Sequence, residues 1–399
     1  MVKKILIFSF YISIHIIYGQ KNDNIIIGKI DRIYSEILNE ERKLLVYVPQ
    51  DNPYDKNSYP VIYLLDGDAH FYSVVGMVHQ LSSINRNRIL PKMIIVGISN
   101  TDRIRDLTPS KGKYENSGGG DDFILFIEKE LIPYVDSNYS TMAYRTFIGH
   151  SLGGLTVMNV MYNKPELFNS YVAIDPSMWW NNRALLTEMK GETLDKRYSD
   201  RTLFLGYANT IRNEMDTLSV QKDTTYATRH IRAILELNSY LNNNNQNYLS
   251  FLSKYYENDD HGSVPLISEY DALRFIFDFY KFKLVDEDYS NPKIDIAEKV
   301  ENYYERLSIG FGIEMKPGEE YVNDIGHRLL REEQFIKAKQ VFELNIKNYP
   351  MNYNVYEAMG DFYSVIQSKD MAIENYKKAY SLNKNSFLIN KVRELESGN

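Results

Sequence analysis

The chain has 399 residues, of which 44% are hydrophobic and 25% are charged, a composition typical of a globular protein with one large domain and a smaller one. Its 53 acidic residues outnumber its 46 basic ones, so it lacks the excess of Lys and Arg that nucleic-acid-binding surfaces carry, and we expect no nucleic-acid partner. The absence of cysteine excludes disulfides, thiolate metal ligands and cysteine nucleophiles.

Residues 1–19 have the layout of a secretory signal peptide. Lys3 and Lys4 form a positive start, residues 5–18 are apolar, and Gly19 offers a small residue at a cleavage point. An uncleaved anchor and a buried segment are the alternatives, but the apolar run is shorter than the roughly 20 residues that span a bilayer. We therefore expect a periplasmic or secreted protein without a stable membrane span.

Residues 30–280 alternate between strand-like and helix-like segments. The strand-like segments are short and rich in apolar residues, and they lie at 42–50, 59–67, 92–99, 145–151, 170–177, 201–209 and 248–257. The helix-like segments have apolar residues at helical spacing, and they lie at 121–135, 154–163, 227–241 and 271–282. This alternation predicts an α/β domain with a mostly parallel central sheet covered by helices on both faces.

Residues 285–399 contain an internal repeat and no strand-like segment. Matching positions lie 34 residues apart in the pairs Gly326 and Gly360, Ala338 and Ala372, and Phe342 and Tyr376. The pattern resembles the tetratricopeptide repeat, in which small residues let two antiparallel helices approach closely. Two copies and one capping helix are few for a free-standing solenoid, so we expect this small all-α module to lean on the first domain.

The segment Gly149-His150-Ser151-Leu152-Gly153 lies between a strand-like and a helix-like run. This G-x-S-x-G pattern is typical of a nucleophile elbow, where a tight turn exposes a serine at the edge of the sheet. Ser151 is then the predicted nucleophile, and the backbone N–H of Leu152 is a predicted oxyanion donor. The alternative is a glycine-rich turn with an idle serine.

A serine nucleophile needs a base, and three histidines follow Ser151 in the chain. His261 lies in a loop just after the last strand-like segment, where α/β-hydrolases place the base. His230 lies within a helix-like run, where we interpret it as a packed or surface residue, and His327 lies in the repeat. We therefore predict that His261 is the general base.

The acid of the triad is less clearly indicated. It normally follows the strand before the last one, but the residue at that strand end is the uncharged Asn209. Asp216 is our first choice, Glu214 the second, and Asp175, after the preceding strand, an outside candidate. A Ser–His dyad is a further alternative.

Other candidate residues lie at the same predicted edge of the sheet. The N–H of Asp68, in the loop after an early strand, is a candidate second oxyanion donor. Trp179 and Trp180 could form a wall for the substrate, or they could be core residues. Arg103 could bind a substrate carboxylate or phenolate, or it could pair internally with Asp102 or Asp106.

Several blocks in order resemble the enterobactin-esterase/esterase D family of serine α/β-hydrolases, over residues 25–282. They include "PVIYLLDGDAHF", "GHSLGGL", "KPELFNSYVAIDPSMWW" and "DDHGSVP". The chain looks most like a secreted subgroup with C-terminal tetratricopeptide repeats. The resemblance implies ester or thioester hydrolysis by Ser151 and His261. Relatives act on siderophore lactones, feruloyl esters and S-formylglutathione, and some transfer acyl groups. Two positions depart from the family: Asn209 replaces a common Glu or Asp, and Asp175 stands where Ser is frequent.

We therefore expect an α/β-hydrolase domain at 25–284 and a helical module at 285–399. The expected function is hydrolysis of a small-molecule carboxylic ester through an acyl-enzyme, with no metal or organic cofactor. An acyltransferase with the same residues is one alternative, and a binding protein on a hydrolase scaffold is another. The helical module could bind a protein or peptide partner, or a second copy of the chain.

Overall fold

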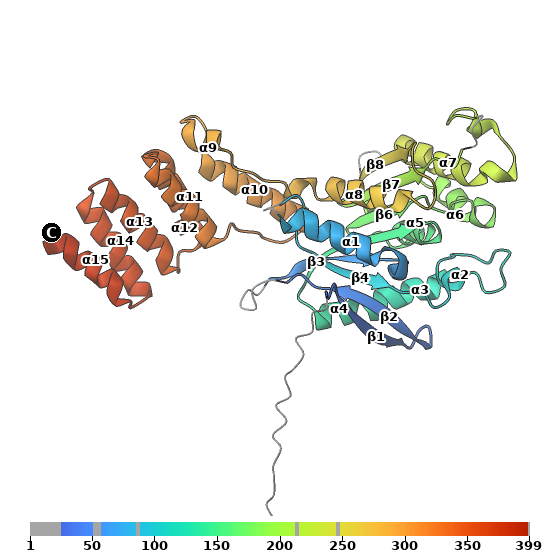
Figure 1. The fold of residues 1–399 in the computed structure, drawn as a ribbon, viewed down its shortest axis with the longest axis horizontal. Helices are drawn as coiled ribbons and strands as arrows, with labels where there is room; N and C mark the ends of the chain where they lie inside the picture. Colours follow the sequence, from blue (N-terminus) through green and yellow to red (C-terminus); the bar gives the residue numbers. More distant parts are fainter. Residues whose placement is uncertain (1–24, 51–56, 85–87, 212–214, 245–247, 398–399) are drawn as a thin grey trace, which may run out of the picture.

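Figure 1 shows a computed structural model in which a domain built on a β-sheet is followed by a row of helices that projects from it. The structure describes residues 25–50, 57–84, 88–211, 215–244 and 248–397. The predicted signal peptide at 1–19 lies outside these residues. We use "sheet domain" for residues 25–280 and "helical module" for residues 286–397.

The sheet of the described residues has eight strands in the order β1-β2-β4-β3-β5-β6-β7-β8. The strands are β1 Lys29–Ser35, β2 Glu40–Tyr47, β3 Tyr59–Leu64, β4 Ile94–Ile98, β5 Thr141–His150, β6 Ser170–Ile174, β7 Arg201–Ala208 and β8 Leu249–Tyr256. Both pairings of β2 are antiparallel, and the pairings from β4 to β8 are parallel. The predicted mostly parallel sheet is therefore confirmed.

Helices cover both faces of the sheet because successive strand side chains point to opposite sides. In β6, Tyr171 and Ala173 enter one buried cluster, and Val172 and Ile174 enter the other. The helices of this domain are α1 Gly67–Ser82, α2 Arg103–Asp106, α3 Gly120–Phe126, α4 Ile132–Asn138, α5 Leu152–Asn163, α6 Trp180–Lys190, α7 Arg229–Asn244 and α8 Val264–Ile276. Buried residues of α3, α5, α6 and α7 pack on the face of the sheet that carries Tyr171 and Ala173. Buried residues of α1 and α8 pack on the opposite face, which carries Val172 and Ile174. The inner parallel strands β3, β4 and β6 are thus buried on both sides, whereas the edge strand β8 exposes Ser250, Leu252 and Lys254.

The helical module is joined to the sheet domain through a shared helix. Its helices are α9 Asp286–Ser290, α10 Ile296–Phe311, α11 Glu319–Arg331, α12 Phe335–Asn348, α13 Tyr353–Val365, α14 Lys369–Leu382 and α15 Ser386–Ser397. The start of α10 packs into the module through Ile296 and Val300, whereas its end packs into the sheet domain through Leu307 and Phe311. Figure 1 shows α10 spanning the two parts.

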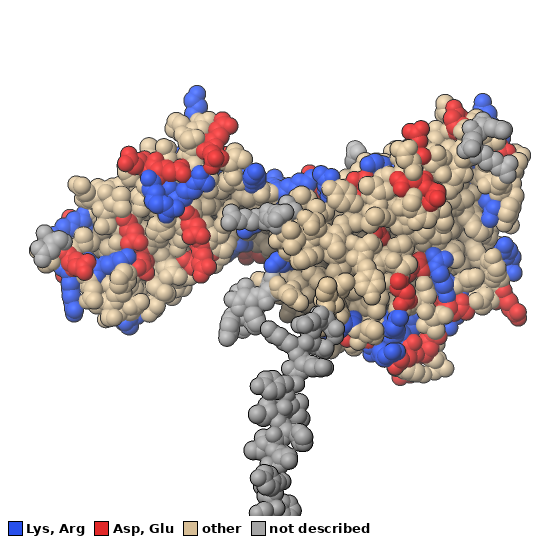
Figure 2. Space-filling model, in the orientation of Figure 1, with Lys and Arg blue, Asp and Glu red and all other residues tan. Residues whose placement is uncertain are grey.

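The 34-residue period coincides with two helix pairs, α11–α12 and α13–α14. A side chain at Gly326 would collide with the ring of Phe342, and one at Gly360 would collide with the ring of Tyr376. Glycine is therefore needed where the two helices of each pair approach closely. Among the described residues, the helices all fall short of the length and apolar character that a membrane crossing requires. Figure 2 shows Lys and Arg interspersed with Asp and Glu over the visible face.

Candidate functional site

Ser151 lies on a strained turn between β5 and α5. Its backbone has φ 60° and ψ −115°, a conformation that non-glycine residues rarely adopt and that nucleophile elbows require. A Cβ at Gly149 would lie under 3.0 Å from the carbonyl oxygen of Gly153, and this contact explains the flanking glycines. The Ser151 N–H donates to the Ile174 carbonyl (2.9 Å) and ties the turn to β6. Ser151 thus lies on a tight turn between the end of β5 and the start of α5.

His261 lies in the loop between β8 and α8, with its ring against Ser151. The distance from His261 Nε2 to Ser151 Oγ is 3.1 Å, a hydrogen bond. The Asp260 carboxylate fixes the loop by accepting the N–H groups of Gly262 (2.8 Å) and Ser263 (2.9 Å). The structure thus brings together the two residues that the sequence predicts as nucleophile and base.

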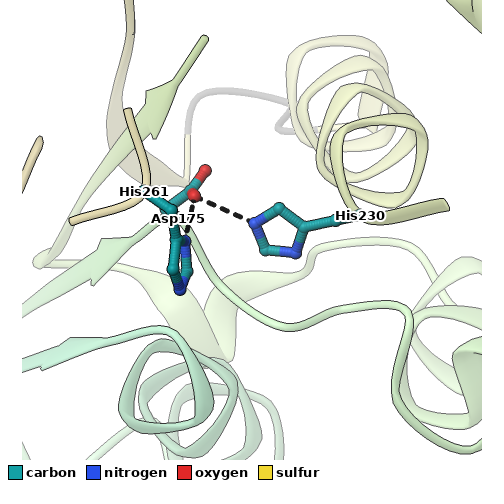
Figure 3. Close-up of side chains that lie close together, drawn as sticks. All are labelled: Asp175, His230 and His261. Carbon is teal, nitrogen blue, oxygen red and sulfur yellow. Dashed lines mark hydrogen bonds and ion pairs between the residues drawn. The ribbon is translucent and has the colours of Figure 1, made fainter. Parts of the chain in front are cut away.

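Asp175 follows β6 and completes a line of hydrogen bonds with these two residues (Figure 3). Its Oδ2 lies 2.5 Å from His261 Nδ1, and its Oδ1 accepts the Ala208 N–H at 3.1 Å. The side chain is fully buried. Burial raises the pKa of Asp175, but hydrogen bonds from His230 and His261 and from the Ala208 N–H outweigh this effect and hold that pKa well below its usual range. The carboxylate is therefore ionised beside His261.

The structure corrects the choice of Asp216 as the acid that orients His261. The Asp216 carboxylate is exposed and accepts the N–H groups of Leu218 (3.1 Å) and Ser219 (2.7 Å) in its own loop. Glu214, the second choice, lies outside the described residues. The acid contact comes instead from the outside candidate Asp175, one strand earlier than the usual position, and Asn209 at the usual position donates its amide to the Glu257 carbonyl (3.0 Å).

A second histidine, His230 on α7, also contacts Asp175. Its Nε2 lies 2.9 Å from the same Oδ2 that His261 approaches, and Figure 3 shows the two rings reaching the carboxylate from different elements. The interpretation of His230 as a residue that only packs or faces solvent is therefore wrong. In the sequence, the one hint of a contact between Asp175 and a second histidine is that Asp175 stands where the family often has Ser. The helical pattern of residues 227–241 gives no sign of a polar contact to the residue after β6.

Asp175, His230 and His261 are also residue types that bind metal ions, and their nearest ligand atoms lie within 4.8 Å of one another. A transition metal holds its nitrogen and oxygen ligands at about 2.0–2.2 Å, which separates the ligand atoms by about 3 Å or more. The separations of 2.5 Å and 2.9 Å between Asp175 and the two rings instead match hydrogen bonds. The spacing therefore favours N–H protons, rather than an ion, between these groups.

The predicted oxyanion donors lie at the ends of neighbouring strands. Leu152 is the first residue of α5, which follows β5, and Asp68 is the second residue of α1, which follows β3. β3 and β5 pair in parallel, so the two helices begin at the same edge of the sheet. N–H groups in a first helical turn have no acceptor within the helix. The Asp68 side chain itself points to Lys43, with an ion pair of 2.7 Å.

Arg103, Trp179 and Trp180 differ in their burial and in their contacts with other residues of the protein. Arg103 binds Asp66 through two hydrogen bonds of 2.6 Å and 2.9 Å, a partner that the sequence did not indicate. Trp180 is buried and donates to the Ser110 carbonyl (3.0 Å), so it is a core residue and not a substrate wall. Trp179 is half-buried, and the Arg229 guanidinium lies 4.3 Å from its ring.

His150 lies beside His261, with ring centroids 4.5 Å apart, but it carries no charge at neutral pH. Burial, followed by the nearby imidazoles of His261 and His70, lowers the pKa of His150 to about 4. The ring next to the predicted base is therefore a neutral packing group, and Asp175 is the charged group that His261 contacts.

Comparison with known proteins places the chain in a family of esterases. A family described as putative esterase matches residues 35–253, more than half of the chain. The ferri-bacillibactin esterase BesA of Bacillus subtilis is 32% identical over 169 residues, which are 37% of this chain and 58% of that protein. The siderophore enterobactin esterase of Emericella nidulans is 31% identical over 150 residues, or 32% and 50%. The match thus spans only about half of the length of these relatives.

The fold is shared with a solved structure. An IroE-like serine hydrolase from Shewanella oneidensis superposes with a TM-score of 0.64 at 29% identity, over 80% of this chain and 98% of that one. The likeness confirms the predicted α/β-hydrolase fold.

Proposed function

Because the chain belongs to the putative esterase family, we propose that it is a serine hydrolase that cleaves carboxylic esters at Ser151. The observation that carries the proposal is the line of hydrogen bonds from Ser151 Oγ through His261 to Asp175, with steps of 3.1 Å and 2.5 Å. A nucleophile, a base and a buried carboxylate in this order form the catalytic arrangement of serine hydrolases.

Each member of this line has a role that follows from its contacts. Asp175 accepts the Nδ1–H of His261, which leaves the Nε2 lone pair directed at the Ser151 hydroxyl. His261 takes the proton as Ser151 attacks the ester carbonyl, and the N–H groups of Leu152 and Asp68 stabilise the negative oxygen. His261 then protonates the leaving alcohol, and water attacks the acyl-enzyme through the same base.

The substrate class that we propose is a siderophore ester, since the two curated relatives act on bacillibactin and enterobactin. We further propose that residues 1–19 direct the chain out of the cytoplasm, and that catalysis resides in the predicted domain at 25–284. The predicted unit at 285–399 is proposed as a second structural module, which packs on that domain through the end of α10. Binding of a protein partner or of a second copy through this module stays a prediction.

The test is hydrolysis of p-nitrophenyl acetate and butyrate by the wild type, Ser151→Ala and His261→Ala. We expect both variants to lose roughly 10³-fold or more in kcat, as enzymes do when a member of a catalytic triad is removed. Catecholate and hydroxamate siderophore esters, followed by chromatography, then define the substrate. Equal rates for the three proteins would contradict the proposal, and ester products formed with an added alcohol would indicate an acyltransferase.

A further inference from the structure

Building on the proposed function, we propose that His230 is a positioning residue that shares the Asp175 carboxylate with His261 and thereby keeps His261 unprotonated at lower pH than Asp175 alone would allow. The usual serine hydrolase site has one histidine on its carboxylate, whereas this chain places two there. His230 contacts neither Ser151 nor any reacting atom in the proposed mechanism, so its action would pass through Asp175.

The sharing follows from which oxygen each donor reaches. Oδ1 of Asp175 accepts the Ala208 N–H, so Oδ2 is the oxygen that both imidazoles approach. The rings of His230 and His261 are nearly perpendicular, at 89°, with centroids 5.2 Å apart, which lets each nitrogen face Oδ2. The Asp175 side chain is fully buried and that of His230 is only 17% exposed, so water competes little for the contact between these two residues, whereas His261 is 43% exposed.

His230 sits at the second position of α7, where the helix fixes its direction. Its neighbour Arg229 is held elsewhere, with its guanidinium over the rings of Trp179 (4.3 Å) and Tyr226 (3.4 Å). The ring of His230 is thus the part of this helical turn that the structure directs at the buried carboxylate.

The electrostatic consequence has a definite sign. A carboxylate stabilises the imidazolium that forms when His261 takes the serine proton, and it does so more strongly when its oxygen has no other donor. The His230 N–H takes up part of the charge on Oδ2, so a proton on His261 gains less there. Removing that N–H should make His261 bind its proton more readily and shift the acid limb of the activity profile to higher pH.

The other charged or titratable groups that the structure describes near the rings of His230 and His261 do not donate to Oδ2 of Asp175. His150 on β5 lies 4.5 Å from the His261 ring and is neutral, because its pKa is lowered to about 4. Asp260 precedes His261 and is held by the N–H groups of its own loop, and Arg229 precedes His230. Among the described groups, His230 is the side chain that competes with His261 for Oδ2.

The experiment compares His230→Met, which removes the donor, with His230→Gln, whose amide N–H lies where Nε2 lay. We measure kcat and KM for p-nitrophenyl butyrate from pH 5 to 9. We expect His230→Met to raise the midpoint of the acid limb by about half a pH unit to one unit, equivalent to about 3- to 10-fold lower kcat/KM below the limb. His230→Gln should recover more than half of that shift, with KM unchanged in both, and exposed His79→Gln on α1 serves as the control.

A readout without turnover separates this proposal from the proposed function. The ring signals of His261 are titrated by NMR in the wild type and both variants. We expect the same upward shift in His230→Met and its recovery in His230→Gln. An unchanged midpoint in His230→Met, or an equal shift in both variants, would overturn the role of His230. An inactive wild type with the expected NMR shifts would overturn only the esterase proposal.

Discussion

The carboxylate of Asp175 is buried, yet three N–H groups reach it, from His230, His261 and Ala208. Such a group stays ionised because the donors stabilise its charge where water cannot. We predict that Asp175→Asn lowers kcat by roughly 10³- to 10⁴-fold with little change in KM, because the amide favours the wrong tautomer of His261. Ester hydrolysis by the purified variant checks this.

Asp216→Asn is the matched control for that prediction, since it makes the same change on a carboxylate that stays within its own exposed loop. We expect its kcat to stay within about twofold of the wild type, because it orients no group of the proposed mechanism. A loss in Asp216→Asn as large as in Asp175→Asn would contradict the assignment of the acid.

Glu269 on α8 is another buried acid, and it is neutral at pH 7 because burial raises its pKa to about 8. His70 lies 3.7 Å away, but burial lowers the pKa of that ring, so the two groups do not form an ion pair at neutral pH. Folded Glu269 keeps a proton that the unfolded chain loses above about pH 4.5, so the free energy of unfolding falls between about pH 4.5 and 8.

We predict that Glu269→Gln removes this loss. Relative to the wild type, the variant should gain on the order of 4 kcal/mol between pH 5 and pH 9, since each unit of pKa corresponds to about 1.4 kcal/mol. Urea unfolding at both pH values measures the change. Exposed Glu166→Gln should show no such gain, and an identical pH dependence in Glu269→Gln and the wild type would contradict the prediction.

At the scale of elements, the turn between β5 and α5 depends on glycine at a defined place. We predict that Gly149→Ala abolishes activity and destabilises the protein by at least about 2 kcal/mol, because its Cβ would overlap backbone atoms that cannot move aside. Gly76→Ala, at an exposed position of α1, has no atom within 4 Å of the new Cβ and should stabilise the helix by about 0.5–1 kcal/mol. Thermal unfolding with an activity assay distinguishes the two substitutions.

The turn between β5 and α5 also illustrates how much of the site could be predicted from the sequence. The turn at Ser151 is encoded within about ten residues, and His261 follows from the order of strands, so both were found. The contact of Asp175 with His261 joins residues 86 positions apart, and that of His230 with Asp175 joins residues 55 apart. Such contacts depend on how β6, α7 and the loop after β8 pack, which periodicity does not encode. The prediction of Asp216, which relied on the usual position of the acid in the chain, was therefore wrong.

On the scale of the whole molecule, α10 joins two cores. The predicted boundary at 284/285 precedes this helix, whose last turn completes the core of the sheet domain. Phe311 is 4% exposed, and its ring contacts those of Phe279 (5.1 Å between centroids) and Tyr144 (5.5 Å). The sheet domain is thus stabilised by a helix that the sequence pattern assigns to the module.

We predict that Phe311→Ala destabilises the sheet domain by about 3–5 kcal/mol, the usual cost of truncating a buried aromatic residue. Ile309→Ala, on the same helix but 77% exposed, should change stability by less than about 0.5 kcal/mol. Both tryptophans, Trp179 and Trp180, lie in the sheet domain, so their fluorescence reports its unfolding alone. Equal fluorescence transitions in the two variants would mean that the domain does not depend on α10.

The reactivity of Ser151 can be measured directly by treating the intact protein with a fluorophosphonate, which labels only an activated serine. We predict one adduct, located on the Ser151 peptide by mass spectrometry, and labelling that is slower by several orders of magnitude in His261→Ala. A wild-type protein that stays unlabelled, or an adduct on another serine, would contradict the assignment of Ser151 as the nucleophile.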